Sequence, residues 1–598
     1  MIPKILIIDS GITHFEKDNT SVGFSFLNNN IGNNLKNNIG HGTAVNYIIK
    51  KYGHSEIINV KIFDDIDDNI VEDNLISLLN YIYINIDVDI IHMSIGITLC
   101  TRKKDLEDIC EKLSNKGVII VSAFSNDGNI SYPAAFKSVI GVDISSRCKK
   151  VTDWEFVESD IINIRGMSCQ QNLPWINGEF KLLAGSSFVA PHITGIISNL
   201  MASGVSNKNE IFSHIRKISK KIHPRKSYNI QEQVFNINKA VIFPFNKEMH
   251  SLVRFQNLLN FQITDVLDLK YMKTINKKSS EILQGQLEND FIIKNIENLN
   301  WNNNFDTFII GHVREINEVI KKDFRRVILE KCLYHGKNVY SLDDLSSYTD
   351  LLEKFKFKNL NVYYPRIVKE NAPNNMFGKL FSTITPAIGV FGTSSKQGKF
   401  TLQLKLKELF MKKGYKVGQL GTEPTSALFG CDFTYPMGYD GIIETNSLES
   451  IAIINEALNH MDEKDYDVII TGSQSQSVPY ALYNLSFLPI EQHNFLLGIA
   501  PEIIVLCVNA YDDYDYIERT IKYLEGIVDT LVIGVVLSPI VRTLDFSNLS
   551  RTIKIMNNDE LIDYRDRLTK HINKDVYLLN ASDEISKLVD NCINYLSN

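Results

Sequence analysis

The sequence predicts an α/β protein, in which parallel sheets are covered by helices on both faces. Short apolar runs alternate with longer segments of helical periodicity, a pattern typical of strands joined by crossover helices. Several of these runs end at a glycine, as expected where a strand turns into a helix. The chain has 598 residues, which is enough for three or four domains of ordinary size.

The composition is that of a globular protein with a large core, because 44% of the residues are hydrophobic and 22% are charged. The net charge of −7 mixes both signs, so neither a nucleic-acid nor a membrane partner is predicted. No apolar run is long enough to span a membrane. The eight cysteines form no CxxC pair, which argues against a zinc site or a disulfide framework and favours a reducing compartment.

The first 240 residues are predicted to form one parallel-sheet domain. Strands are expected at 4–8, 58–63, 88–94, 117–123 and 138–142, with helical segments between them. The stretch 28–38 is rich in Asn and Gly and is expected to be a polar loop.

Three polar residues of this region stand at predicted element ends. Asp9 closes the first strand, and His41 lies between two glycines at a predicted helix start. Ser187 is expected in the first turn of an apolar helix, where Pro191 fits because a first-turn residue needs no N–H. Each alone has an ordinary explanation, as a turn, core or cap residue. Together they could form a nucleophile, its base and a group that orients the base.

Residues 3–240 resemble the subtilisin-like serine proteases of the peptidase S8 type, whose catalytic residues follow the same order. Segment 89–96 looks like the family's substrate-binding strand, and segment 118–128 looks like the strand that carries its oxyanion asparagine. Tyr132 and Pro133 stand where the family has a Tyr-Pro turn. The resemblance therefore implies a subtilisin-like α/β/α fold and endopeptidase activity without a metal or cofactor.

The same resemblance implies a role for each site residue. His41 would take the proton of the Ser187 hydroxyl, and Asp9 would hold the imidazole. The side-chain amide of Asn126 and the Ser187 N–H would stabilise the oxyanion, and loss of such a donor costs about 100- to 1,000-fold in turnover, a range known from a subtilisin. The implied substrate-binding residues are Ser94, Ile95, Gly96 and Ser125.

The substrate region departs from the family pattern. Ile97 follows Gly96 where a second glycine is common, and Phe124 and Ser125 precede the oxyanion asparagine where glycine is common. We expect these side chains to narrow or reshape the primary pocket, which alters preference rather than abolishing activity.

The first predicted strand begins at Lys4, which leaves no room for a signal peptide or an N-terminal pro-segment. We therefore expect cytoplasmic residence. No acidic cluster has calcium-binding spacing, so no metal is predicted.

Residues 241–385 are predicted to form a second, Rossmann-like α/β domain. A strand at 306–311, a helix at 315–334 and a strand at 338–342 make a βαβ unit, and 358–364 supplies a further strand. There is no GxGxxG, so a structural role is predicted rather than a dinucleotide site. Segment 373–386 is expected to be a linker.

Residues 386–598 are predicted to form a P-loop NTPase-like α/β domain. A strand at 387–391 leads through a glycine-bounded loop into a helix at 402–413, the context that a phosphate-binding loop needs. Phe400 replaces the usual Ser or Thr, and Thr401 follows it. The candidate nucleotide-binding residues are Gly392, Thr393, Gly398, Lys399 and Thr401, with ATP and Mg²⁺ as candidate ligands.

Residues 246–598 resemble P-loop proteins of the dethiobiotin-synthetase-like group, and more closely an uncharacterised P-loop family with a Rossmann-like N-terminal domain. Segments 418–423 and 467–472 supply further matching strands. That family usually has Glu-Gly-Gln after the last of these strands, whereas this chain has Gly-Ser-Gln at 472–474. Glu423 and Asp432 are the candidates to replace the missing acid, and nucleotide binding is favoured over hydrolysis.

Three functions follow from these motifs. The first is a cytoplasmic subtilisin-like endopeptidase with a nucleotide-binding module, cleaving a specific peptide such as the leader of a ribosomally made natural product. The second is an ATP-dependent ligase or kinase acting on a peptide or amino acid, with the protease half as a recognition scaffold. The third, a binding protein with two inactive sites, is disfavoured because Asp9, His41, Ser187 and Asn126 are all present.

Overall fold

The computed structural model describes residues 2–13, 22–36, 38–63, 68–225, 234–283, 287–438, 441–480, 482–510, 512–545 and 550–597. The chain divides into two compact units. Unit 1 consists of Met1–Ser227 together with Pro373–Ile384, and unit 2 consists of Tyr228–Ala372 together with Thr385–Asn598. The unit boundaries therefore differ from the predicted domain boundaries at 240 and 385.

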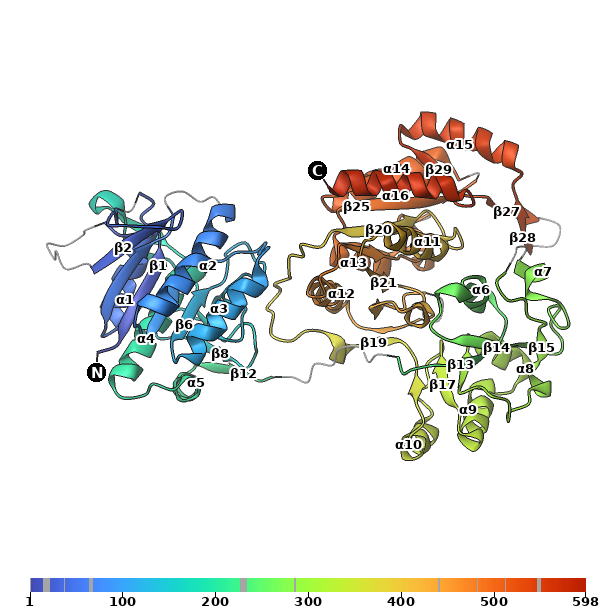
Figure 1. Cartoon of the computed structure of the whole chain (residues 1–598), viewed down its shortest axis with the longest axis horizontal. Coiled ribbons are helices and arrows are strands. Elements are labelled where there is room, and N and C mark those ends of the chain that lie inside the picture. Colours follow the sequence, from blue (N-terminus) through green and yellow to red (C-terminus); the bar gives the residue numbers. More distant parts are fainter. Residues whose placement is uncertain are drawn as a thin grey trace. The chain divides into compact units, whose positions relative to one another are not determined.

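Unit 1 is built around a central sheet with helices on both faces (Figure 1). Its helices are α1 (His41–Tyr52), α2 (Asp68–Asn85), α3 (Lys103–Asn115), α4 (Ala190–Ala202) and α5 (Lys208–Lys217). Its strands are β1 (Lys4–Asp9), β2 (Val22–Leu27), β3 (Asn30–Gly32), β4 (Glu56–Lys61), β5 (Ile90–Met93), β6 (Ile119–Ala123), β7 (Val139–Ser145), β8 (Glu155–Val157), β9 (Ile164–Met167), β10 (Gln171–Pro174), β11 (Phe180–Leu183) and β12 (Lys221–His223).

The described sheet has the order β12-β8-β9-β7-β6-β5-β1-β4-β2-β3, and its central pairs from β7 to β4 are parallel. The five strands expected from the sequence are all confirmed. In β1, Ile5 and Ile7 pack with α1 and α4, whereas Leu6 and Ile8 pack with α2 and α3. Successive side chains of a strand point to opposite faces, so a wholly apolar strand serves two helical layers.

Two local predictions for unit 1 were wrong. The expected polar loop at 28–38 contains β3, which pairs with β2 in an antiparallel hairpin. Its turn residues Asn28 and Asn29 adopt positive φ angles of 49° and 62°, which asparagine tolerates better than most residues. Ser187 lies in a short 3₁₀ helix, Ser186–Phe188, that precedes α4 rather than in α4 itself.

The segment expected to be a linker is instead packed into unit 1. Met376 is buried in the core between the sheet and the α2–α3 layer, and Phe377 and Phe381 pack against the same core. We call residues 373–384 the strap. Its apolar residues lie in irregular structure without a strand or helix pattern, so the sequence alone did not distinguish the strap from a loop.

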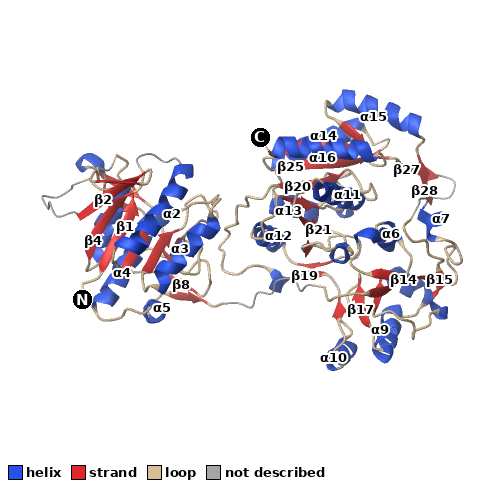
Figure 2. Cartoon of the chain, in the orientation of Figure 1, coloured by secondary structure: helices blue, strands red, loops and turns tan. Residues whose placement is uncertain are grey.

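The two largest sheets of unit 2 are parallel, and Figure 2 shows them in red among their covering helices. The elements before the strap are β13 (Lys239–Phe243), α6 (Lys247–Arg254), β14 (Gln262–Asp268), α7 (Ser279–Leu283), β15 (Lys294–Asn295), β16 (Thr307–Ile310), α8 (Arg314–Ile320), α9 (Phe324–His335), β17 (Asn338–Ser341), α10 (Thr349–Phe357), β18 (Val362–Tyr363) and β19 (Arg366–Val368).

The elements after the strap are β20 (Ala387–Gly392), α11 (Lys399–Lys412), β21 (Val417–Gly421), β22 (Phe433–Thr434), β23 (Ile442–Glu444), α12 (Ser447–Asp462), β24 (Val468–Thr471), α13 (Ile490–Ile499), β25 (Ile503–Asn509), α14 (Tyr514–Ile527), β26 (Leu531–Ser538), β27 (Ile540–Asp545), β28 (Ser550–Ile555), α15 (Asn558–Ile572), β29 (Val576–Leu578) and α16 (Ser582–Leu596). The described sheet orders are β15-β14-β13-β16-β17-β18 and β22-β21-β24-β20-β25-β26-β29.

The helix expected at 315–334 is two helices. Lys321 has a φ of 53° and ends α8, and the Asp323 side chain then accepts from the N–H of Arg326 as the N-cap of α9. An N-cap aspartate starts a new helix even where the apolar periodicity continues.

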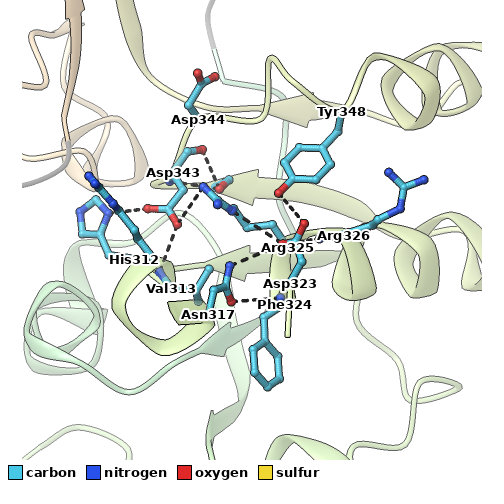
Figure 3. A network of polar contacts seen from close by, with 12 residues as sticks. His312, Val313, Asn317, Asp323, Phe324, Arg325, Arg326, Asp343, Asp344 and Tyr348 are labelled. Atoms are coloured by element: carbon cyan, nitrogen blue, oxygen red, sulfur yellow. Dashed lines mark hydrogen bonds and ion pairs between the residues drawn. The ribbon is translucent and has the colours of Figure 1, made fainter. Parts of the chain in front are cut away.

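A buried polar network closes the carboxyl ends of β16 and β17 (Figure 3). The Asp343 carboxylate accepts from Nδ1 of His312 at 2.8 Å and from the N–H of Val313 at 3.1 Å. The Arg325 guanidinium lies 3.8 Å from the same carboxylate. Since Asp343 is only 3% exposed, these contacts compensate its removal from water.

Within the described residues, no helix combines the length and the apolar character that crossing a membrane requires. All eight cysteines carry free thiols.

Candidate active site

Asp9 and His41 form the charged core of the candidate site in unit 1. Asp9 ends β1 and is 2% exposed. Its Oδ1 accepts from Nδ1 of His41 at 2.9 Å, its Oδ2 lies 3.0 Å from the same nitrogen, and Oδ1 also accepts from the N–H of Ser10 at 2.7 Å. The predicted pairing of acid and histidine is therefore present in the structure.

The glycines on either side of His41 are required by close packing. Gly40 has a φ of 93°, and a Cβ there would lie 2.5 Å from the ring of Trp175. A Cβ on Gly42 would lie 2.2 Å from the carbonyl oxygen of Gly11. Only glycine fits both positions, so the Gly-His-Gly sequence allows α1 to begin against the end of β1.

The charge of His41 is controlled by Asp9. Burial by itself lowers the pKa of His41, but the charge of Asp9 and its hydrogen bond act the other way and prevail, so the pKa is raised above 6.5. With Nδ1 bound to the carboxylate, Nε2 is the nitrogen left to exchange a proton with a nucleophile.

Ser187 lies next to this pair. It is 9% exposed, and the ring of the following residue, Phe188, has its centroid 5.2 Å from that of His41. No hydrogen bond joins the Ser187 hydroxyl to His41 among the described contacts. Such bonds are often long in a free enzyme and tighten when substrate binds.

A chain of polar contacts holds the Ser187 backbone, and the sequence analysis did not identify it. Ser94 Oγ donates to the Ser187 carbonyl at 3.0 Å, and Nε2 of His92 lies 2.9 Å from Ser94 Oγ. Nδ1 of His92 lies 2.8 Å from Thr194 Oγ1. Burial lowers the pKa of His92 to about 3, so this imidazole is neutral.

Asn126 is held by the residue before the serine. Its Oδ1 accepts from the N–H of Ser186 at 3.0 Å and lies 3.0 Å from the Ser186 hydroxyl oxygen. A Cβ on Gly185 would lie 2.8 Å from this oxygen, so the approach requires glycine. The contact with Ser186 therefore fixes the side-chain amide of Asn126, a residue that is itself exposed.

The predicted substrate-binding residues lie together and leave little space. Ser125 N–H donates to Ser131 Oγ at 2.8 Å. A Cβ on Gly96 would lie 2.8 Å from Ser125 N and 2.9 Å from Ser131 Oγ. Ile95 is 8% exposed and belongs to the core beneath. Ser131, which the sequence analysis did not single out, therefore packs with Ser125 against Gly96.

Phe124 does not act as predicted. Its ring is 1% exposed and packs in the core, where a Cβ on Gly141 would lie 2.8 Å from it. Phe124 directly follows the buried strand β6, and its side chain reaches the interior of unit 1.

A second candidate site lies in unit 2, at the loop between β20 and α11. Lys396 and Gly398 have positive φ angles of 61° and 80°, and α11 begins at Lys399. The buried ammonium of Lys399 donates to the carbonyls of Ser394 at 2.7 Å and Ser475 at 3.1 Å. The predicted strand, loop and helix are present.

A cavity of about 520 Å³ adjoins this loop. Gly398, Lys399 and Thr401 line it, and so do the basic residues Lys247 and Arg254 of α6 together with Glu248 and with His250, whose pKa burial lowers to about 4. Gly392 and Thr393 are not among its lining residues. The Thr393 hydroxyl donates to Asp512 at 2.6 Å, so it serves the loop's own structure.

The two candidate acids differ in position. Glu423 lines the cavity beside the loop, whereas Asp432 lines a different one. The Asp432 carboxylate accepts from Lys464 at 2.8 Å, Tyr466 at 2.7 Å and the N–H of Gln419 at 3.0 Å. Asp432 is therefore a structural residue, and Glu423 remains the candidate.

Comparison with known proteins assigns the first part of the chain to a class. Residues 3–213 match the Subtilase family, Peptidase_S8. Over 212 residues the chain is 29% identical to the minor extracellular protease Epr of Bacillus subtilis, a match that covers 33% of this chain and 32% of that protein. The chain therefore spans about a third of the length of this curated relative. The N-terminal part of the chain, residues 3–213, thus matches a subtilase domain.

Solved structures show weaker likenesses. A DUF1611 family protein from Anabaena variabilis matches 60% of this chain and 100% of its own, with a TM-score of 0.43 and 13% identity. A cold adapted subtilisin-like serine proteinase matches 36% of this chain and 81% of its own, with a TM-score of 0.29 and 17% identity.

Proposed function

We propose that the chain is a serine endopeptidase with Asp9, His41 and Ser187 as its catalytic residues. The Asp9–His41 hydrogen bond of 2.9 Å, beside the turn that carries Ser187, is the observation that carries the proposal. Three such groups in one place meet the requirements of acyl transfer: a nucleophile, a base and a group that fixes the base.

The reaction follows from the positions of these groups. His41 Nε2 takes the proton of the Ser187 hydroxyl as the oxygen bonds to the peptide carbonyl carbon. Asp9 stabilises the imidazolium through Nδ1. The C–N bond then breaks, and the imidazolium returns the proton to the departing amine. Water, activated by the same imidazole, hydrolyses the ester and restores Ser187.

Asn126 would donate to the oxyanion that forms in both steps. Its Oδ1 is fixed by Ser186, so the amide is oriented before substrate arrives. A donor that needs no reorganisation stabilises charge better than solvent water does.

The substrate we propose is a restricted set of peptides, such as the precursor of a ribosomally made natural product. The close approach of Gly96 to Ser125 and Ser131 favours a small side chain at the primary position. We place the reaction in the cytoplasm, where eight unpaired thiols would stay reduced.

A fluorophosphonate probe tests this proposal without a known substrate, since it reacts with an activated serine. We expect labelling of the full chain and none of Ser187→Ala. Ser203→Ala, which alters an exposed serine after α4, is the matched control and should be labelled like the wild type. Equal labelling of wild type and Ser187→Ala would reject the proposal.

The second candidate function is nucleotide binding at the β20–α11 loop, with ATP and Mg²⁺ as the ligands. It is favoured by the adjoining cavity, which Lys396 and Lys399 line together with basic residues of α6. Thr401 and Glu423 supply the oxygen donors that Mg²⁺ prefers, and the bound ion would neutralise phosphate charge. On this proposal the module either controls proteolysis or makes the chain a ligase or kinase.

Binding of ATP with Mg²⁺, measured by calorimetry on the full chain, tests the second function. We expect Lys399→Ala to weaken binding at least about tenfold, because its ammonium would contact the terminal phosphates. Lys412→Ala changes an exposed lysine of the same helix and should leave binding unchanged. Wild-type binding by Lys399→Ala would exclude the loop as the site.

A further inference from the structure

The loop that carries Asn126 has little packing of its own. Asn126, Asp127 and Gly128 are exposed, and a Cβ on Gly128 would meet nothing within 4 Å. The ends of the loop are different, because Phe124 and Ile130 are each 1% exposed. Besides the contact of the Asn126 side chain with Ser186, the position of the loop is therefore set by what holds these two ends.

The strap holds the far end of the loop. The N–H of Ile130 donates to the Leu380 carbonyl at 2.9 Å. The side chain of Asn129 reaches Ser382 Oγ at 3.4 Å. Ile130 and Phe381 also pack in the same core. These contacts fix the chain three and four residues after Asn126.

The strap also holds the near end, through Lys379. This lysine is only 8% exposed, and its ammonium lies 3.4 Å from the Asp143 carboxylate and 5.8 Å from the centre of the Phe124 ring. The Phe124 carbonyl in turn accepts from the hydroxyl of Ser186, the residue that holds Asn126. Lys379 thus contacts the start of the loop, two residues before the amide.

The strap is itself tightly fixed. Phe377 has a φ of 53°, which costs a bulky residue about 1 kcal/mol. The Arg165 guanidinium lies over its ring at 3.9 Å and His223 packs edge-to-face against it at 5.1 Å, and these contacts offset that cost. Arg165 also lies 3.6 Å from Asp143, so the strap joins an ionic network of the sheet.

We propose that the strap positions the oxyanion loop and that Lys379 is a positioning residue that acts through Asn126. The proposal rests on the proposed serine-protease function. On this proposal residues 373–384 are part of the catalytic apparatus of unit 1, although 145 residues of unit 2 separate them from the rest of unit 1 in the sequence.

The test is the rate at which a fluorophosphonate probe labels the full chain, measured over a range of probe concentrations. We expect Lys379→Met to lower the labelling rate at saturating probe concentration about tenfold. This is smaller than the loss expected when the Asn126 amide itself is removed. The probe concentration that gives half of the maximal rate should not change. Lys379→Arg should recover most of the rate, because it keeps the charge beside Asp143. Lys150→Met, at an exposed site of unit 1, is the control and should match the wild type.

A double-mutant cycle separates positioning from a general loss of structure. In an Asn126→Ala background, Lys379→Met should change the rate less than about twofold, because the group through which it acts is gone. An equal fall in both backgrounds, or no fall in the wild type, would overturn the proposal. Lys379→Gln serves as a second variant if thermal unfolding shows that Lys379→Met is unfolded. Absence of labelling that depends on Ser187 in the wild type would instead reject the protease function.

Discussion

At His41, burial and a neighbouring carboxylate act on the same imidazole in opposite directions, and the carboxylate prevails. A pKa above 6.5 means that the ring is protonated, and therefore unable to act as a base, over a wider pH range than a free histidine. His92 does not contribute to this titration, because burial lowers its pKa to about 3.

We therefore predict that probe labelling rises with pH through an apparent pKa above 6.5, measured as the labelling rate from pH 5 to 9. Asp9→Asn should lower the maximal labelling rate, reached at high pH, about 10,000-fold. It should also move the rise of the labelling rate to lower pH, because burial then lowers the pKa of His41 unopposed. Glu179→Gln, on the exposed surface, is a control that should leave the profile in place. If the labelling rate of Asp9→Asn rose over the same pH range as that of the wild type, the attribution of this titration to His41 would be contradicted.

Among the elements, the carboxyl ends of β16 and β17 in unit 2 are joined by the buried carboxylate of Asp343, which lies outside both strands. Asp343 follows β17 and binds His312 and the backbone N–H of Val313, which follow β16 (Figure 3). Removing one partner of a buried ion pair leaves the other desolvated and uncompensated.

Asp343→Ala should therefore lower the free energy of unfolding of unit 2 by about 3 kcal/mol, measured by urea denaturation. Glu353→Ala, on the exposed side of α10, should change it by less than about 0.5 kcal/mol. A loss no larger than that of the control would show that the network contributes little to stability.

The elements also show where sequence patterns suffice. The strands of unit 1 were predicted because a strand buried on both faces is an uninterrupted apolar run, as in Ile5 to Ile8. The break between α8 and α9 was not predicted, because apolar periodicity runs on across Lys321 while the cap at Asp323 decides the outcome. The hairpin at β3 was missed because asparagine-rich sequence is typical of loops and of turns alike.

For the whole molecule, the candidate catalytic residues of unit 1 have local sequence signals, whereas the strap that packs beside them has none. Asp9, His41 and Ser187 were predicted because they stand beside glycines at predicted element ends and follow the order of the catalytic residues in the subtilisin-like proteases. The strap was not found, because Asn129 and Ser382 meet across 253 positions and no periodicity encodes such a contact. The orientation of Phe124 and the structural role of Asp432 likewise depend on packing partners elsewhere in the chain.

The strap also bears on how the two units can be inherited. A gene that broke between the two units would carry away Pro373–Ile384 with the second product, although these residues pack in the first. Recombination that replaced the coding region of residues 1–227 with that of a different domain would leave a strap whose side chains fit the original unit 1 and not its replacement. We therefore expect the sequences of the two units to change together in evolution. A version of unit 1 that exists as a separate protein would need other residues in place of Lys379 and its neighbours.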